Sequence, residues 1–392
     1  MQRAINGHNS REGGIQIHGR TSRCIASTKR KFRDHLKGLG LDPFVKTIDD
    51  RSDLKNFLGF QWKEIATDQL TPEGDTSQLC QKLQLDTFNR SGDLEREILV
   101  AMLLCPVPFQ FPSYDELITA VHIRRNIVEA ARKTSLSFAT YEAERPAEYW
   151  HYDEDRGFVL HPGKSLIAAL KQATQPELSG QRYTFSCRRA AEYIMLLAMA
   201  SEAMTCNPDL FHDLQRQAET RAIKGREFES VFLRPIGSLH NPLPVKFFIP
   251  GDRTWFRNPD RISSEVTGYE GSWTFYLGNG QFADFWRPGQ FYSLTTKCLS
   301  IFHWRNSTYR DAEGELQIDE QRVESLVEKS LQNPAETNQI LREMLQLQEP
   351  LDVFAGGAIE AHREHARQIF RGSSDLTLPD ILAKGSSEGV MN

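Results

Sequence analysis

A cysteine stands directly before an apolar helical run within residues 180–199. Ser186 suits the N-cap position, so Cys187 falls in the first turn of the predicted helix. Unpaired backbone N–H groups and the positive end of the helix dipole lower the pKa of a thiol at this position, and Arg188 and Arg189 add positive charge. The pattern is typical of a nucleophilic cysteine, although cysteine also commonly fills a protein core.

The chain is long enough and apolar enough to bury a core. Its 392 residues are 39% hydrophobic and 10% aromatic, which suits one large domain with accessories or two domains. The net charge of −5 leaves no domain-wide basic surface, so we expect no nucleic-acid partner. No apolar stretch reaches transmembrane length, and the N-terminus lacks a signal-peptide apolar region. We therefore expect no membrane partner, and a location that is cytoplasmic or reached by export without a signal peptide.

The cysteines are widely spaced and form no CxxC pair. This usage predicts free thiols in a reducing compartment, not a disulfide framework or a zinc site. The six positions are Cys24, Cys80, Cys105, Cys187, Cys206 and Cys298.

Helical spacing dominates the chain before the cysteine. Apolar residues at helical intervals predict a helix within 93–105, and the proline-rich stretch 106–112 ends it. Ser113 then caps a second helix, with Glu116 as its capping-box partner. Residues 138–162 change to an alternating, aromatic character, which predicts two short strands around a charged turn.

Strand signals follow the cysteine helix and recur from 231 to 286. The dipeptide Asn279-Gly280 lies between two alternating stretches and is the strongest hairpin signal of the chain. Helices followed by antiparallel strands predict an α+β domain. A cysteine at the start of a central helix packed on such a sheet is, by analogy, the layout of a papain-like cysteine enzyme.

These changes in pattern divide the chain into three segments. Residues 1–92 are predicted as a partly flexible N-terminal extension, loosely structured with a few short helices. Residues 93–310 contain the predicted domain. Residues 311–392 are predicted as a helical C-terminal extension that ends in a mobile Gly/Ser-rich tail.

Several patches carry a more specific signal: 106–117, 125–131, 138–140, 149–150, 183–187, 251–252 and 256–259. In this order they resemble the bacterial spore-coat type of transglutaminase, a protein-glutamine γ-glutamyltransferase. The resemblance covers residues 105–305, about half of the chain. It implies a compact core related to papain-like and NlpC-like hydrolases.

The resemblance implies acyl transfer through a thioester. Cys187 attacks the side-chain amide of a protein glutamine, ammonia leaves, and a lysine amine resolves the thioester into an isopeptide cross-link. Water resolves the thioester instead when no amine is present, which is deamidation. Protein substrates are the implied partners, and no metal or organic cofactor is implied. Backbone N–H groups at the helix start could stabilise the oxyanion.

Three polar partners that the family provides for the thiol are replaced in this chain. The family has a glutamate directly before the cysteine, where this chain has Ser186. A second glutamate on a late strand corresponds to Ser272, and a histidine on the next strand corresponds to Phe285. General-base help is worth roughly 100- to 10,000-fold in rate, so a thiol without these partners is a weakened nucleophile.

The predicted hairpin places the replaced positions in space. With a two-residue loop Thr274 pairs with Phe285, so Ser272 and Phe285 share one face of the sheet. Glu270 is the only ionisable candidate on that face. Asp284 points to the other face unless a bulge shifts the register by one residue.

Three functions remain open from the sequence. The first is an acyl-transferase with a rearranged site, in which Cys187 works with Glu270 or Asp284. The second is a cysteine hydrolase of the same fold, either a glutamine deamidase or a peptidase. The third is a catalytically inactive descendant that binds protein in the former active-site cleft. A histidine from elsewhere, His240 or His303, is a further candidate partner for the thiol, and geometry decides between them.

Overall fold

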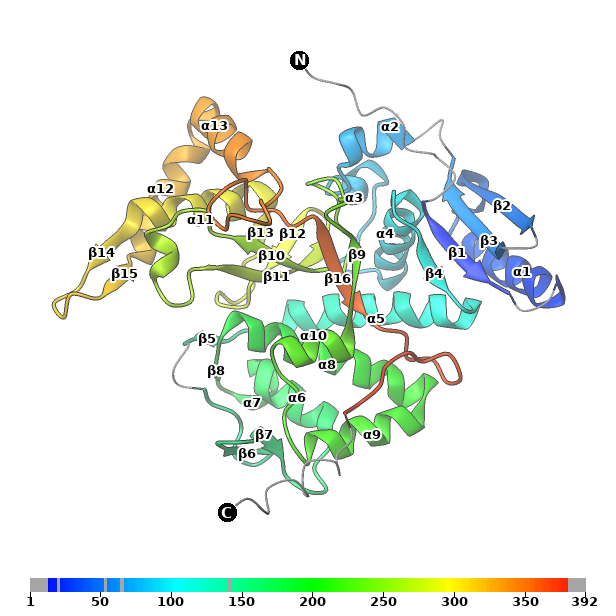
Figure 1. The fold of residues 1–392 in the computed structure, drawn as a ribbon, viewed down its shortest axis with the longest axis horizontal. Helices are drawn as coiled ribbons and strands as arrows, with labels where there is room; N and C mark the ends of the chain where they lie inside the picture. The colour runs from blue at the N-terminus through cyan, green and yellow to red at the C-terminus, as the bar shows by residue number, and fades with distance from the viewer. Residues whose placement is uncertain (1–12, 20–21, 53–54, 64–66, 140–142, 380–392) are drawn as a thin grey trace, which may run out of the picture.

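Figure 1 shows the chain as a computed structural model, which describes residues 13–19, 22–52, 55–63, 67–139 and 143–379. Within these residues the helices are α1 (Ser22–Gly38), α2 (Thr67–Leu70), α3 (Leu79–Lys82), α4 (Ser91–Leu104), α5 (Tyr114–Lys133), α6 (Leu166–Thr174), α7 (Pro176–Ser179), α8 (Cys187–Cys206), α9 (Pro208–Ala218), α10 (Arg226–Phe232), α11 (Leu294–Ser307), α12 (Glu320–Leu331) and α13 (Pro334–Met344). The strands are β1 (Ile15–His18), β2 (Val45–Ser52), β3 (Lys55–Trp62), β4 (Phe109–Phe111), β5 (Ser137–Phe138), β6 (Trp150–Asp153), β7 (Gly157–Leu160), β8 (Thr184–Phe185), β9 (Leu233–Gly237), β10 (Arg253–Arg257), β11 (Gly271–Gly278), β12 (Gln281–Ala283), β13 (Tyr292–Ser293), β14 (Thr308–Arg310), β15 (Leu316–Ile318) and β16 (His362–Ala366).

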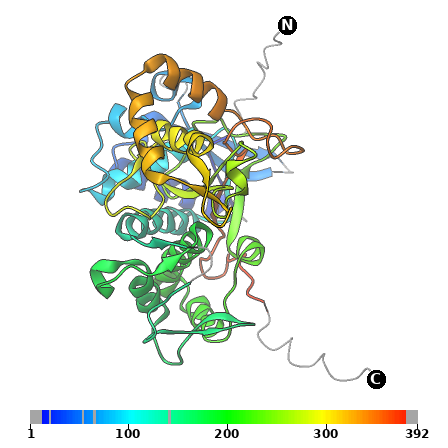
Figure 2. The same cartoon turned by 90° about the vertical axis from the view of Figure 1, so that its left-hand side faces the viewer.

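A six-stranded antiparallel sheet forms the centre of the fold, in the order β13-β12-β11-β10-β16-β9. Side chains of β11 alternate between two cores. Phe275 and Leu277 join the core that includes α5 and α8, whereas Tyr276 joins the core that includes α11. In the turned view, the yellow and orange helices α11 to α13 lie above and the green helices around α8 lie below (Figure 2). This mixture of helices with an antiparallel sheet confirms the predicted α+β class.

Helix α5 begins where the sequence indicated. The side-chain oxygen of Ser113 accepts a hydrogen bond from the backbone N–H of Glu116 at 3.0 Å. The Glu116 carboxylate does not complete a capping box. It accepts hydrogen bonds instead from the backbone N–H groups of Ile369 and Phe370, each at 3.1 Å. The side chain thus ties the start of α5 to a segment near the end of the chain.

Helix α8 also begins as predicted. The Ser186 hydroxyl accepts from the backbone N–H of Arg189 at 3.5 Å, and Cys187 is the first helical residue. The apolar face of α8 packs against α5 and α6 and against β11. This packing fixes the position of the cysteine, because the helix that carries it is central to the larger core. Residues of that face include Ala190, Ala191, Ile194, Met195 and Ala198.

The first 92 residues contain more regular structure than the sequence indicated. They form α1 and most of a four-stranded sheet with the order β2-β3-β1-β4. Ile15, Phe32 and Phe60 are fully buried in the same core as α5 and α8. The interpretation of this segment as loosely structured is wrong, because its short apolar pieces are strands that pair with one another and with Phe109–Phe111.

The C-terminal segment contributes a strand to the central sheet. Helices α12 and α13 lie in this segment and cover the face of the sheet that α11 also covers. Strand β16 then inserts between β10 and β9. The sequence pattern did not indicate this strand, whose residues, His362–Ala366, are mostly polar. The predicted mobile tail falls partly on 380–392, which lie outside the described residues.

Candidate active site

A cleft of about 230 Å³ lies where α8 begins, beside β11 and the end of β12. Three of the four predicted site residues, Cys187, Ser272 and Asp284, line it together. The other lining residues come from α11, from the loops on either side of β13 and from neighbouring segments. They are Phe138, Gly268, Tyr269, Gly271, Trp286, Arg287, Tyr292, Lys297, Ser300, Trp304 and Glu320.

The hairpin between β11 and β12 forms at the predicted dipeptide. Asn279 and Gly280 both have positive φ, 52° and 68°, the conformation that a two-residue hairpin turn requires. The backbone N–H of Asn279 donates to Oε1 of Glu97 on α4 at 3.0 Å. Helix α4 therefore anchors the turn through a buried carboxylate.

The register of this hairpin differs by one residue from the prediction. An irregularity directly after Tyr276 shifts the two strands, so that Tyr276 pairs with Phe282. Because side chains alternate along a strand, this shift brings Asp284 to the face of Ser272. The predicted placement of Phe285 on that face is wrong.

Phe285 turns into the core instead. Its φ of 75° is a left-handed conformation that is uncommon for a residue other than glycine. Its carbonyl oxygen accepts from the backbone N–H of Leu136 at 2.9 Å, and its buried ring lies 6.0 Å from that of Phe275. These contacts fix the chain directly after Asp284, whose side chain remains in the cleft.

Asp284 forms a buried ion pair. Its Oδ2 accepts from Nζ of Lys297 on α11 at 2.9 Å, and the two side chains are 6% and 4% exposed. The Lys297 ammonium also lies 4.9 Å from the ring centre of Tyr292. Oδ1 of Asp284 has no hydrogen-bond partner among the described residues. Asp284 therefore has one oxygen held by Lys297 and one buried oxygen that no hydrogen bond joins to the Cys187 thiol in this structure.

Burial raises the pKa of the Cys187 thiol above its ordinary value. Hydrogen bonds from the backbone N–H groups of Trp273 and Arg188 act in the opposite direction, as does the positive charge of Lys297. The negative charge of Glu270 adds to the rise. The expected lowered pKa is wrong, because the loss of hydration at this helix start outweighs the N–H groups there.

The two arginines that follow the cysteine are engaged outside the cleft. Arg188 forms an ion pair with Glu229 at 2.7 Å, and Arg189 forms one with Glu192. Neither arginine lines the cleft. Lys297, which is distant in sequence, is the cation that acts on the thiol in their place.

The other predicted partners of the thiol do not line the cleft. Glu270 is exposed just before β11, and His240 is exposed after β9. His303 is buried on α11, where its ring nitrogens contact Ser330 at 2.8 Å and Asn306 at 3.1 Å. The lining of the cleft therefore contains an aspartate and a lysine but no histidine.

Aromatic side chains form the walls of the cleft. The rings of Phe138 and Trp286 meet edge to face with centroids 5.0 Å apart. The hydroxyl of Tyr269 donates to Glu320 at 2.8 Å, and burial raises the pKa of that tyrosine. Apolar walls over a polar floor suit a side chain that has an aliphatic stem and an amide end.

Lys297 is the site residue that sequence reasoning missed. It lies within residues 291–304, a largely apolar stretch of the sequence. A lone lysine in such a stretch is a usable signal, because lysine is almost never fully buried unless it is paired. The signal does not identify the partner, which depends on the hairpin register.

The part of the chain that the structure describes lacks two further features. No group of three or more His, Cys, Asp or Glu side chains is placed to hold a metal ion. No described helix combines the length and the apolar character needed to cross a membrane.

A cleft that contains a cysteine at the start of a helix, in an α+β fold, is typical of proteins with a cysteine nucleophile. Residues 74–291 match the family described as protein-glutamine gamma-glutamyltransferase, and this range is more than half of the chain. The chain belongs to this family, which the sequence resemblance had indicated.

Individual relatives are distant. A protein-glutamine gamma-glutamyltransferase of Halalkalibacterium halodurans is 25% identical over 211 residues, which are 50% of this chain and 66% of that relative's length. A solved transglutaminase from Geobacillus stearothermophilus, without its C-terminal extension, is 19% identical. The structural match covers 55% of this chain and 98% of the solved chain, with a TM-score of 0.38.

Proposed function

We propose that this protein transfers the acyl group of a protein glutamine side chain to an amine, with Cys187 as the nucleophile. Membership of the family supports the reaction class. The observation that carries the assignment of residues is that Cys187, Asp284 and Lys297 line one cleft. In this proposal the helix α8 and the central sheet form a papain-like core, with the nucleophile at the helix start.

The first half of the reaction forms a thioester. The free Oδ1 of Asp284 accepts the thiol proton, and the thiolate attacks the amide carbon of glutamine. Backbone N–H groups at the start of α8 donate to the oxyanion that develops. The carbon–nitrogen bond then breaks, and ammonia leaves with the proton that Asp284 had taken. Lys297 holds the other carboxylate oxygen throughout, so the carboxylate stays oriented.

The second half transfers the acyl group. The amine of a lysine side chain attacks the thioester carbon and loses a proton to Asp284. The carbon–sulfur bond breaks, and the sulfur leaves as a thiolate that regains the proton. The product is an isopeptide bond between two protein side chains. When water attacks in place of the amine, the same steps convert glutamine to glutamate.

The replaced partners affect the rate of this reaction. A carboxylate is a weaker base than the imidazole that the resemblance places at Phe285, and burial keeps the Cys187 thiol protonated. Little thiolate is therefore present at neutral pH. We expect slow turnover at pH 7 that increases as the solution becomes alkaline, and Ser272 contributes only a hydroxyl to the floor of the cleft.

The test is incorporation of a fluorescent primary amine into casein, run at several pH values beside an assay for released ammonia. Cys187→Ala is the inactivating variant. Cys206→Ala is its matched control, because Cys206 ends the same helix and does not line the cleft. We expect incorporation by the native protein and by Cys206→Ala, and none by Cys187→Ala.

Other results would replace the proposal. Ammonia release that depends on Cys187, without amine incorporation, assigns a cysteine hydrolase to the same site. The absence of both reactions at every pH overturns catalysis. In that case the raised thiol pKa and the loss of the histidine at Phe285 favour a protein that uses the cleft only for binding.

A further inference from the structure

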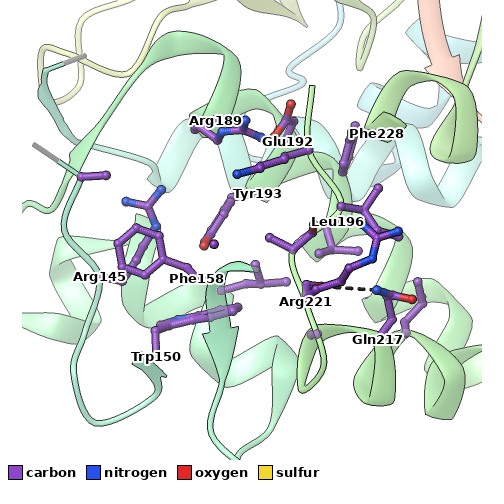
Figure 3. Close-up of a pocket in the computed structure, with 18 of the residues that line it drawn as sticks. Arg145, Trp150, Phe158, Arg189, Glu192, Tyr193, Leu196, Gln217, Arg221 and Phe228 are labelled. Carbon is purple, nitrogen blue, oxygen red and sulfur yellow. Dashed lines mark hydrogen bonds and ion pairs between the residues drawn. The ribbon is translucent and has the colours of Figure 1, made fainter. Parts of the chain in front are cut away.

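A second cavity, of about 180 Å³, lies on another side of the cysteine helix α8. Its walls come from the middle of α6, from α8 and α9, from the β6–β7 hairpin, and from α10 with the segment that leads into it. Figure 3 shows the side chains that line it. No residue that lines it also lines the cleft at Cys187. The lining is largely apolar, and Trp150, Phe158, Leu196 and Phe228 are among its members. This cavity is therefore separate from the cleft of the proposed acyl transfer.

A buried arginine lines this cavity. Arg145 is only 7% exposed, and its guanidinium carbon lies 3.2 Å from the ring centre of Phe185. The rings of Phe158 and Tyr193 lie on other sides, each centred 4.7 Å away. Burial lowers the pKa of Arg145, because the charged guanidinium loses hydration there.

The charge of Arg145 is only partly balanced, by the negative charge of Glu192, which acts on it without an ion-pair contact. Its Nη1 donates to the carbonyl oxygens of Thr184, at 2.9 Å, and Glu144, at 2.6 Å, and the Tyr193 hydroxyl is a further neutral partner. Its Nε is buried without a hydrogen-bond partner. Among the described residues no acidic side chain forms an ion pair with it, in contrast to the other arginines of the cavity. A buried charge without an ion-pair partner is unfavourable, so the site favours an anion.

The other cations at the cavity show this contrast. Arg189 forms an ion pair with Glu192, and Arg221 forms two hydrogen bonds with Glu227, at 2.5 and 2.7 Å. Lys224 is exposed and lines the same cavity. Besides Arg189 and Arg221, whose charges are paired, the cavity therefore presents two cations: Arg145, which is buried, and Lys224, which is exposed.

We propose that this cavity binds a small aromatic monocarboxylate, with its ring in the apolar interior and its carboxylate on Arg145. Carboxylates bind arginine through directed N–H donors, and Arg145 is a buried arginine that lines the cavity. The volume suits a single ring, since an apolar cavity of about 150 Å³ is known to take benzene. Lys224 at the cavity attracts the anion from solvent. This proposal concerns binding only and does not depend on any reaction at Cys187.

The test is calorimetric titration of the full chain with 3-phenylpropionate, beside its neutral amide as the matched ligand. We expect a Kd of about 1 mM or lower for the acid. The amide should bind about tenfold more weakly or worse, because it lacks the charge that Arg145 receives. Equal affinity for acid and amide, or no measurable binding of the acid, overturns the proposal.

Variants locate the binding. Leu196→Trp fills the cavity from α8 and should abolish binding of the acid, and Lys224→Gln should weaken it. Arg226→Gln is the control for Lys224→Gln, because it removes the same exposed charge two residues away and does not line the cavity. Arg145→Met should abolish the preference for the acid over the amide. If Arg145→Met does not fold, the comparison of acid with amide and the Leu196→Trp variant still test the proposal. Unchanged binding of the acid by Leu196→Trp refutes this cavity as the binding site.

Discussion

Nζ of Lys297 and Oδ2 of Asp284 lie 2.9 Å apart at the floor of the cleft that Cys187 also lines. The two residues come from different elements, α11 and the chain after β12, and both side chains are almost fully buried. Removing charges from water is costly, and the mutual attraction of the pair offsets that cost only while both partners are present. The pair is therefore a structural requirement of the cleft as well as a part of its proposed chemistry.

Lys297→Met should destabilise the fold by about 3–5 kcal/mol, because it leaves the Asp284 carboxylate buried without its partner. The double variant Asp284→Leu with Lys297→Met should recover most of this loss, since neither charge remains. Urea unfolding of the native protein, the single variant and the double variant measures the three free energies.

An exposed lysine provides the control for this comparison. Lys329→Met on α12 removes the same charge from the surface and should change the free energy of unfolding by less than about 0.5 kcal/mol. If Lys297→Met is no more destabilising than Lys329→Met, the ion pair does not contribute to stability as argued.

Alkylation of Cys187 should show a raised thiol pKa whose value responds to two neighbouring charges in opposite directions. Lys297→Met should raise the pKa further, because the ammonium stabilises the thiolate. Glu270→Gln should lower it, because that carboxylate opposes the thiolate. The measurement is the rate of reaction with iodoacetamide against pH, followed by mass spectrometry of the peptide that contains Cys187. Shifts of the same sign in both variants would contradict this account of the site.

The parts of the site that could be predicted from the sequence depend on local interactions. The start of α8 follows from a serine cap and an apolar helical run, and the position of Cys187 follows from the cap. The hairpin turn follows from Asn279-Gly280, because few other residues adopt positive φ at both turn positions.

The register of the hairpin and the partner of Asp284 could not be predicted in the same way. The one-residue shift after Tyr276 is accompanied by the left-handed backbone of Phe285, which contacts Leu136 from a distant part of the chain. Such contacts do not appear in the pattern of β11 and β12. The predicted direction of the Cys187 pKa shift was wrong for a similar reason. Burial raises that pKa, and burial is a property of the packed fold and not of the helix start alone.

Glu97 should make the protein less stable as the pH rises. Burial raises the pKa of this carboxyl from 4.5 to about 7, so between these values the folded state binds a proton that the unfolded state has lost. The free energy of unfolding therefore falls as the pH increases from 4.5 to 7, by up to about 3 kcal/mol from this group.

Glu97→Gln should remove this part of the pH dependence, because glutamine resembles the protonated form at every pH. Urea unfolding at pH 5 and pH 8 measures the difference. Glu129→Gln on the exposed side of α5 is the control and should leave the native difference unchanged. His365, whose pKa burial lowers to about 3, contributes the opposite slope below 6.5 in both proteins and cancels in the comparison. An unchanged pH dependence in Glu97→Gln would exclude the buried carboxyl as its source.

Gly278→Ala should be more destabilising than a positive φ alone explains, because the added Cβ would meet the same buried carboxylate. Gly278 has a φ of +81°, and a Cβ there would lie 2.5 Å from Oε2 of Glu97. Gly163 has a φ of +78° with no heavy atom within 4 Å of such a Cβ, so Gly163→Ala measures the backbone cost alone. That cost is about 1–2 kcal/mol. The Gly278 variant adds to it the displacement of a carboxylate that accepts from the backbone of Asn279. Thermal and urea unfolding of the two variants isolate this contact, and equal losses would mean that Glu97 moves aside without cost.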